Sequence, residues 1–132
     1  MPTEKQKRIL VVEDDTAMAE IMINKLTTSG FDVAHAENGQ KATELVVSFK
    51  PNLVLLDLML PILDGFGVLR FIRTHKDKNL KDTPVVILTN LWSKEEIIKA
   101  KELNVQDYII KAYLTTEEIL EKIKLVLAKH GQ

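Results

Sequence analysis

The sequence predicts an α/β fold in which a single doubly wound sheet of five parallel strands lies between two layers of helices. Two observations support this fold class. Short apolar runs alternate five times with longer amphipathic segments, an order typical of parallel sheets covered by helices on both faces. The 132-residue chain also lacks internal repeats, linkers and low-complexity segments, and its length fits one domain with one core.

The strands are expected where short apolar runs end at polar or turn residues. The run Leu53–Leu56 has no polar interruption, which is typical of a strand buried on both faces. The run Phe31–Ala36 is less apolar, so we expect it nearer an edge of the sheet. The five predicted strands are, in chain order, Ile9–Val12, Phe31–Ala36, Leu53–Leu56, Pro84–Leu88 and Asp107–Ile110.

The helices are expected where apolar side chains recur at helical spacing. Ser93–Glu96 and Thr115–Glu118 have the pattern of capping boxes, so we expect the fourth and fifth helices to begin there. Gly30 should end the first helix, Asn38–Gly39 should form a turn, and residues 75–83 should form a polar loop. The side chains expected to face the core from the first, second, third and fifth helices are Met18, Ile21, Met22 and Leu26, then Ala42, Leu45, Val46 and Phe49, then Phe66, Leu69 and Ile72, and then Ile119, Ile123, Val126 and Leu127.

The composition limits the classes of partner. The chain has 18 basic and 19 acidic residues mixed along its length, for a net charge of −1. This balance offers no electrostatic reason for direct contact with nucleic acid or an anionic membrane. The absence of cysteine excludes disulfides and thiolate metal sites. Residues 1–8 do not have the apolar core of a signal peptide, and no apolar run is long enough to span a bilayer. We therefore expect a cytoplasmic domain.

Polar side chains follow four of the predicted strands. Asp57 ends the buried third strand, and Pro61 forces the chain to leave the sheet soon afterwards. Glu13–Asp15 follow the first strand, Thr89 the fourth and Lys111 the fifth. Because the carboxyl ends of parallel strands share one edge, where α/β folds bind their ligands, we expect these side chains to converge.

The chemistry of this edge favours phosphoryl transfer. Converging carboxylates repel one another unless a cation lies between them, and hard oxygen ligands without nearby His or Cys favour Mg²⁺. Lys111 adds a positive charge suited to an anionic ligand, and Thr89 adds a hydroxyl donor. A cation, an ammonium, a hydroxyl and a carboxylate nucleophile together describe a phosphoryl-acceptor site.

The chain resembles the response-regulator receiver domains of two-component signalling, which have the CheY-like, flavodoxin-like three-layer fold, over nearly its whole length. The stretch Asp57–Pro61 followed by Asp64–Gly65 is strongly family-like, and Tyr108 matches the aromatic switch residue three positions before the lysine. The family's acidic pair, acceptor aspartate, threonine and lysine correspond to Glu13 and Asp14, Asp57, Thr89 and Lys111. The resemblance implies a receiver domain at 8–130 after a short polar tail at 1–7.

The resemblance implies a role for each matching residue. Asp57 would accept a phosphoryl group from a phosphohistidine on a sensor histidine kinase or phosphotransfer protein. Asp14, Asp57 and the backbone carbonyl of Met59 would bind Mg²⁺ directly, and Glu13 would act mostly through water. Lys111 would hold a phosphoryl oxygen. The protein would be a phosphorylated switch and no enzyme beyond its own phosphorylation and dephosphorylation.

The resemblance also implies how the switch would act. Thr89 would swing toward the phosphoryl group, and Tyr108 would turn inward into the space that opens. The readout would be the surface of the fourth helix, the fifth strand and the fifth helix, where Ile98, Lys101, Tyr108 and Tyr113 lie. The partners there would be an output protein or domain that the sequence does not name, or a second copy in a phosphorylation-dependent homodimer. Since no DNA-binding or catalytic segment follows the last helix, we expect a stand-alone receiver or an excised domain.

The sequence departs from the family pattern at three places: Ala112 replaces the proline after the lysine, Asn90 replaces a small residue, and Asn104–Val105 replaces Gly-Ala. The family's peptide bond after the lysine is usually cis. A cis bond before a residue other than proline costs about 2.5–4 kcal/mol, so we predict a trans Lys111–Ala112 bond.

Three other functions compete with a phosphorylated receiver. A haloacid-dehalogenase-like phosphatase would need a second acid two residues after the nucleophile, where Met59 stands. A flavodoxin-like FMN protein needs a hydroxyl- and glycine-rich loop, whereas Glu13–Asp15 would repel a phosphate. A receiver-like scaffold that binds proteins without phosphorylation remains the main alternative. We expect His35, His75 and His130 to be surface residues, and Trp92 to lie in a loop where it covers the core or anchors a partner.

Overall fold

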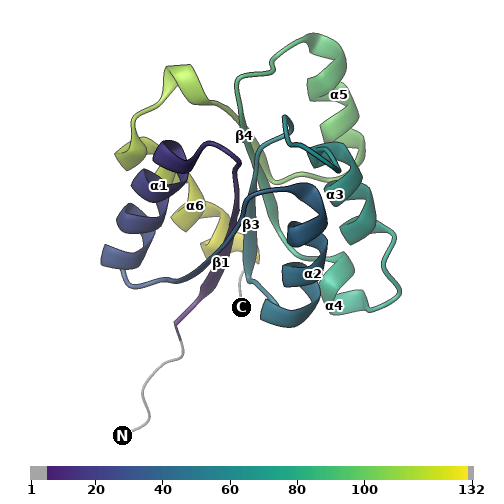
Figure 1. The fold of residues 1–132 in the computed structure, drawn as a ribbon, viewed down its shortest axis with the longest axis horizontal. Helices are drawn as coiled ribbons and strands as arrows, with labels where there is room; N and C mark the ends of the chain where they lie inside the picture. Colours follow the sequence, from purple (N-terminus) through teal and green to yellow (C-terminus); the bar gives the residue numbers. More distant parts are fainter. Residues whose placement is uncertain (1–5, 131–132) are drawn as a thin grey trace, which may run out of the picture.

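The computed structural model describes residues 6–130 and has the predicted fold class, a sheet between two helical layers (Figure 1). Most of the predicted polar tail at 1–7 lies outside the described residues. The sheet order is β2-β1-β3-β4-β5, and every pair of neighbouring strands is parallel. The buried third strand is therefore central and the less apolar second strand is at an edge, as predicted. The strands are β1 (Arg8–Val12), β2 (Asp32–Ala36), β3 (Leu53–Leu56), β4 (Val85–Thr89) and β5 (Asp107–Ile110).

The helices cover both faces of the sheet. In Figure 1, α1 and α6 lie on one side, and α2, α3, α4 and α5 lie on the other. A short 3₁₀ turn, η1 (Lys111–Tyr113), follows β5. Among residues 6–130, no helix is both long enough and apolar enough to cross a membrane. The helices are α1 (Thr16–Thr28), α2 (Gly39–Phe49), α3 (Gly65–Arg73), α4 (Lys78–Lys81), α5 (Lys94–Glu102) and α6 (Thr116–His130).

The core is divided by the sheet into two apolar layers. Successive strand residues point to opposite faces, so in β1 Leu10 and Val12 join one layer while Ile9 and Val11 join the other. The predicted helical faces fill these layers, with one exception. Ile21 is 51% exposed, because α1 presents Ala19, Met22 and Leu26 to the core instead.

Two local predictions need correction. Residues 75–83 are not wholly a loop, because α4 forms a single helical turn there. Asp77 caps it by accepting a hydrogen bond from the Asn79 amide at 3.0 Å. Asn38 begins a helix rather than a separate turn, since its side chain accepts from the Lys41 amide at 2.8 Å at the start of α2. Short polar side chains serve turns and helix caps equally well, which is why the sequence pattern did not separate the two.

The structure shows how the backbone accommodates two residues that differ from the family pattern, Asn104 and Ala112. Asn104, in the place of a family glycine, has φ of 57°, and asparagine tolerates this left-handed conformation better than most residues. No peptide bond among residues 6–130 is cis, so the Lys111–Ala112 bond is trans, as predicted.

Gly65 determines how closely α3 approaches the end of β3. Asp64 caps α3 by accepting from the Gly67 amide at 2.9 Å, and the Gly65 amide donates to the Leu58 carbonyl at 3.0 Å. A Cβ atom at position 65 would lie 2.4 Å from the Asp57 carbonyl oxygen and 2.5 Å from Leu58 Cα. These are backbone atoms and cannot move aside, so only glycine allows the chain to pass this close to Asp57.

We expect Gly65→Ala to lower the free energy of unfolding by about 1–3 kcal/mol, the usual cost of overpacking. Gly67→Ala is the matched control on the same helix, because its Cβ would meet the Leu63 side chain rather than backbone. Urea denaturation of both variants measures the difference. A Gly65→Ala protein as stable as Gly67→Ala would contradict this interpretation.

Candidate functional site

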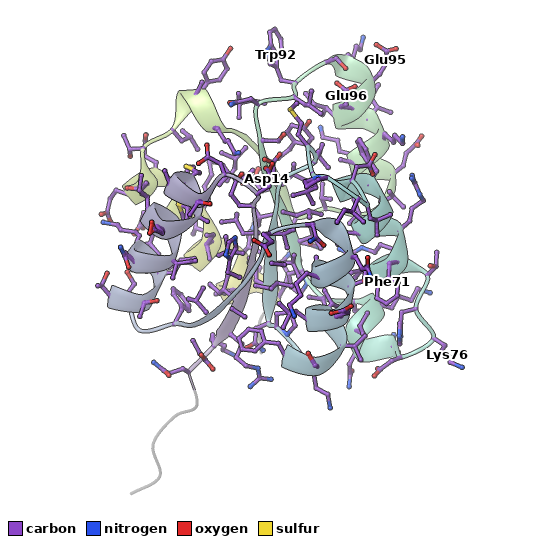
Figure 2. The ribbon with its side chains drawn as sticks, viewed as in Figure 1. Asp14, Phe71, Lys76, Trp92, Glu95 and Glu96 are labelled. Carbon is purple, nitrogen blue, oxygen red and sulfur yellow. The ribbon has the colours of Figure 1, made fainter. Side chains whose placement is uncertain are left out.

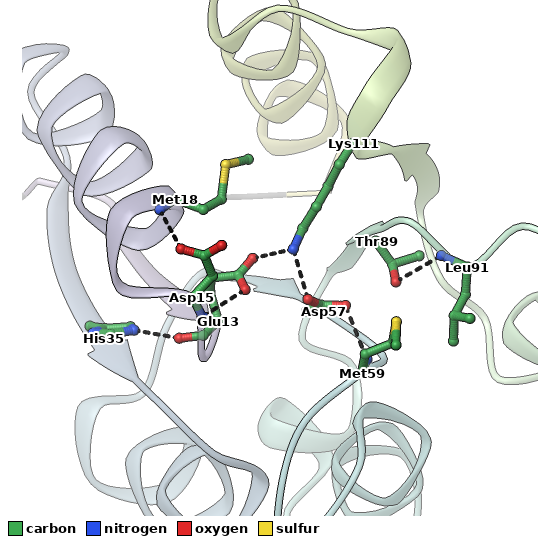
Figure 3. A network of polar contacts seen from close by, with 9 residues as sticks. All are labelled: Glu13, Asp15, Met18, His35, Asp57, Met59, Thr89, Leu91 and Lys111. Atoms are coloured by element: carbon green, nitrogen blue, oxygen red, sulfur yellow. Dashed lines mark hydrogen bonds and ion pairs between the residues drawn. The ribbon is translucent and has the colours of Figure 1, made fainter.

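The side chains predicted to converge meet at the carboxyl edge of the sheet (Figure 3). Asp57 directly follows β3, and its amide donates to the Val12 carbonyl of β1 at 3.1 Å. Lys111 enters from the end of β5. The loops after β1 and β3 border a shallow hollow over these groups, and its lining residues are Glu13, Asp14, Asp15, Asp57, Leu58, Met59, Leu60, Pro61, Asp64 and Lys111.

Lys111 bridges two acidic side chains. Its Nζ lies 2.8 Å from Asp57 Oδ2 and 2.6 Å from Glu13 Oε1. Burial would lower the pKa of the Lys111 ammonium, but the hydrogen bonds to Asp57 and Glu13 outweigh burial and raise that pKa above its ordinary value. Lys111 therefore carries a positive charge at neutral pH.

The Glu13 carboxylate is buried and has two hydrogen-bond donors. Burial raises the pKa of its carboxyl above the ordinary value, the hydrogen bond from Lys111 opposes this effect, and the nearby charge of Asp57 adds to it. Its other oxygen accepts from the Asp15 amide at 3.1 Å. The Glu13 carboxylate is thus oriented by one ammonium and one amide.

Asp57 is oriented in a similar way. Its Oδ1 accepts from the Met59 amide at 3.0 Å while Oδ2 contacts Lys111, and its side chain is 5% exposed. Asp14 is exposed, and Figure 2 shows it near the carboxyl ends of the central strands. The Asp57 carboxylate is therefore held in one orientation, and the exposed Asp14 lies close to it.

The acidic residues fit a divalent cation. Glu13, Asp14 and Asp57 each offer a carboxylate oxygen, and these atoms all lie within 4.8 Å of one another. Three carboxylates and one lysine leave two formal negative charges, 3 − 1 = 2, which a divalent ion would balance. Carboxylate oxygens are the ligands that Mg²⁺ prefers. Asp15 caps α1 by accepting from the Met18 amide at 3.1 Å.

The two predicted switch residues contact the same backbone segment. Thr89 is fully buried, and its hydroxyl accepts from the Leu91 amide at 3.3 Å. The Tyr108 hydroxyl donates to the Leu91 carbonyl at 2.6 Å. Burial, with the charges of Glu96 and Asp57, raises the pKa of Tyr108 to about 12, so the phenol keeps its proton. The Leu91 residue therefore links Thr89 to Tyr108.

The prediction that His35 is a surface residue is wrong. It is half-buried on β2, and its Nε2 lies 2.7 Å from the backbone carbonyl oxygen of Glu13. The ring of His75 packs edge-on against Phe71 with centroids 5.6 Å apart, so it too is partly buried. His130 is exposed, as predicted. Trp92 is 60% exposed and does not cover the core (Figure 2).

Residues 9–124 match the family model described as the response regulator receiver domain. Among curated proteins, the chain is 35% identical over 122 residues to the DNA-binding dual master transcriptional regulator RpaA of Synechocystis, covering 92% of this chain and 49% of RpaA. It is also 35% identical to the probable transcriptional regulatory protein SilR of Salmonella typhimurium, covering 92% of this chain and 51% of that one. The chain thus spans about half the length of the curated relatives it matches.

Solved structures agree with this similarity. A CheY-like response regulator receiver domain protein from Methanospirillum hungatei superposes with a TM-score of 0.87 at 27% identity, covering 96% of this chain and 97% of that one. The BeF3-activated N-terminal receiver domain of RstA from Klebsiella pneumoniae superposes with a TM-score of 0.79 at 33% identity, covering 92% and 98%.

The curated relatives correct one expectation. The net charge of −1 led us to expect no direct nucleic-acid contact, yet RpaA is described as a DNA-binding regulator, and SilR as a probable transcriptional regulatory protein. That expectation is wrong, because the charge of a single domain reports nothing about the half of such a regulator that it does not include. On the match to residues 9–124 and on these relatives, the chain belongs to the response-regulator receiver domains of two-component signalling.

Proposed function

We propose that residues 8–130 form a phosphoryl-accepting receiver in which Asp57 takes a phosphoryl group from a phosphohistidine on a sensor kinase or phosphotransfer protein. The observation that supports this most is the state of the Asp57 carboxylate. It is almost fully buried, yet it adjoins the open hollow and is oriented by Lys111 and the Met59 amide. A fixed carboxylate beside a fixed ammonium is suited to attack an electrophilic phosphorus.

In the proposed transfer, an Asp57 oxygen forms a bond to phosphorus while the bond from phosphorus to the donor's imidazole nitrogen breaks. A bound Mg²⁺ would neutralise phosphoryl charge during this exchange. Glu13, Asp14, Asp57 and the Met59 backbone carbonyl would hold it, with Glu13 acting mostly through water. Lys111 would move from the free carboxylate to a phosphoryl oxygen, a short displacement because its Nζ is 2.8 Å from Asp57 Oδ2.

The contacts of Leu91 suggest how phosphorylation would reach the surface. Turning the Thr89 hydroxyl toward a phosphoryl oxygen removes its contact with the Leu91 amide, and Tyr108 holds the carbonyl of the same residue. Movement of the β4–α5 loop would then release Tyr108 to turn inward. The face of α5, β5 and α6 would change with it, including Ile98, which is 47% exposed, and Tyr113, which is 68% exposed. A two-state switch of this kind needs only a local change of charge.

Output through transcription is the proposal that the curated relatives support, since RpaA and SilR are transcriptional regulators of about twice this length. In that arrangement the phosphorylation state of the receiver would control DNA binding by the regulator. The α5–β5–α6 face would bind either that output part or a second receiver. The alternative, a scaffold that binds proteins without phosphorylation, would need the Lys111–Asp57 ion pair only to balance charge and gives no reason for its place beside an open acidic hollow.

We expect acetyl phosphate with Mg²⁺ to add one phosphoryl group to the wild-type chain and none to Asp57→Asn. Intact-mass spectrometry measures this directly. Asp64→Asn is the matched control, because Asp64 is a nearby exposed acid and asparagine can still cap α3. A phosphoryl group retained on Asp57→Asn would disprove the acceptor assignment, and an unmodified wild type would favour the scaffold.

We expect Asp14→Ala to weaken Mg²⁺ binding by more than the ~10–100-fold typical of losing an outer-shell partner, because it removes a direct ligand. Phosphorylation of this variant should be lost as well. Asp15→Asn should bind Mg²⁺ almost normally, since Asp15 caps α1 and asparagine preserves the cap. Titration calorimetry or amide-shift titration provides the affinities. Equal losses in the two variants would show that the ligand assignment is wrong.

Addition of a phosphoryl mimic such as beryllofluoride should shift NMR amide signals mainly in β4, the β4–α5 loop, α5 and β5. The physical reason is the shared contact of Thr89 and Tyr108 with Leu91. Tyr108→Phe removes the hydroxyl bond to Leu91 and should reduce the shifts in α5 while leaving those near Asp57 unchanged. Shifts confined to α1 and α2 would contradict this route.

A further inference from the structure

We infer that His35 is a positioning residue for the acidic loop between β1 and α1. Its ring N–H holds the Glu13 carbonyl, and this contact sets the geometry in which Glu13 and Asp14 meet a divalent ion. The inference rests on the proposed function, because it assigns His35 a role toward the proposed Mg²⁺ site. Figure 3 shows the ring extending from β2 to the backbone of Glu13.

Both backbone polar groups of Glu13 are bound by the edge strand β2. Its amide donates to the Ala36 carbonyl at 3.0 Å, and its carbonyl oxygen lies 2.7 Å from His35 Nε2. A carbonyl oxygen can only accept, so Nε2 is the nitrogen that carries the proton. The first bond continues the β1–β2 ladder, whereas the second depends on one side chain.

The Glu13 carbonyl belongs to the peptide that links Glu13 to Asp14. Its orientation therefore sets the plane of that peptide and the direction in which the Asp14 side chain leaves the backbone. The Glu13 side chain has its own restraints, in Lys111 and the Asp15 amide. Asp14 is exposed and gains little restraint from packing, so it depends most on the backbone that precedes it. Loss of the His35 contact should affect the metal ligand set mainly through Asp14.

Packing alone does not account for a histidine at this position. Val33 lies two residues earlier on the same face of β2, and it packs against the apolar layer under α1 and α6. An apolar side chain at position 35 would continue that layer but would leave the Glu13 carbonyl without this donor. Outer-shell hydrogen bonds of this kind orient metal ligands and change metal affinity.

Three variants test the inference. His35→Leu keeps much of the side-chain volume and removes the donor, so we expect Mg²⁺ affinity to fall by about tenfold, the lower end for an outer-shell partner. His35→Gln supplies an N–H at a similar reach and should restore most of the affinity. Val33→Ala is the control for general loosening of β2, and it should lower the urea midpoint without changing Mg²⁺ affinity.

Mg²⁺ affinity is measured by amide-shift titration of residues 13–15, and stability by urea denaturation. The inference is overturned if His35→Leu binds Mg²⁺ as tightly as wild type, if His35→Gln does not recover affinity, or if Val33→Ala weakens binding as much as His35→Leu. Failure of the proposed function is distinguishable, because the wild type itself would then bind no Mg²⁺.

Discussion

The Lys111 ammonium between two buried carboxylates is the interaction on which the rest of this site depends. Its partners Glu13 and Asp57 are each 5% exposed, and without the lysine their charges would repel in a poorly hydrated place. The acids follow β1 and β3, which are neighbours, and the lysine follows β5, two strands away from β3. The ion pairs therefore require three strands to end at the same level, and only the assembled parallel sheet provides this.

The loops around the ion pairs are held by a helix cap, a close backbone contact and single hydrogen bonds. Asp15 caps α1, Gly65 allows α3 to pass beside the Asp57 carbonyl, and Leu91 is held from both sides by Thr89 and Tyr108. Such contacts can be exchanged without unfolding the core. Loop contacts of this kind suit the proposed two-state switch, because phosphorylation would change the charge at the site and leave the core as it is.

The sequence predicted most of the fold and the meeting of polar side chains at one edge of the sheet, because both follow from local patterns. Asp57 and Lys111 could be placed at one sheet edge from the rule that parallel strands share their carboxyl ends. His35 could not be predicted, because its contact with Glu13 depends on the register that pairs Val11 with His35 across a connection of a whole helix. The hydrogen bond from Tyr108 to Leu91 was also missed, because it depends on the conformation of the β4–α5 loop beside β5. The α4 turn was missed because one capped turn has too few residues to show periodicity.

The net charge of this chain was a poor guide to whether nucleic acid is among its partners. A net charge of −1 is a sum over all 132 residues, so it reports neither where basic side chains gather nor what a longer regulator contacts. Regulators such as RpaA bind DNA, and this chain spans about half of RpaA. In the proposed switch, the exposed side chains of Ile98 in α5 and Tyr113 in η1 would provide apolar area for a protein partner.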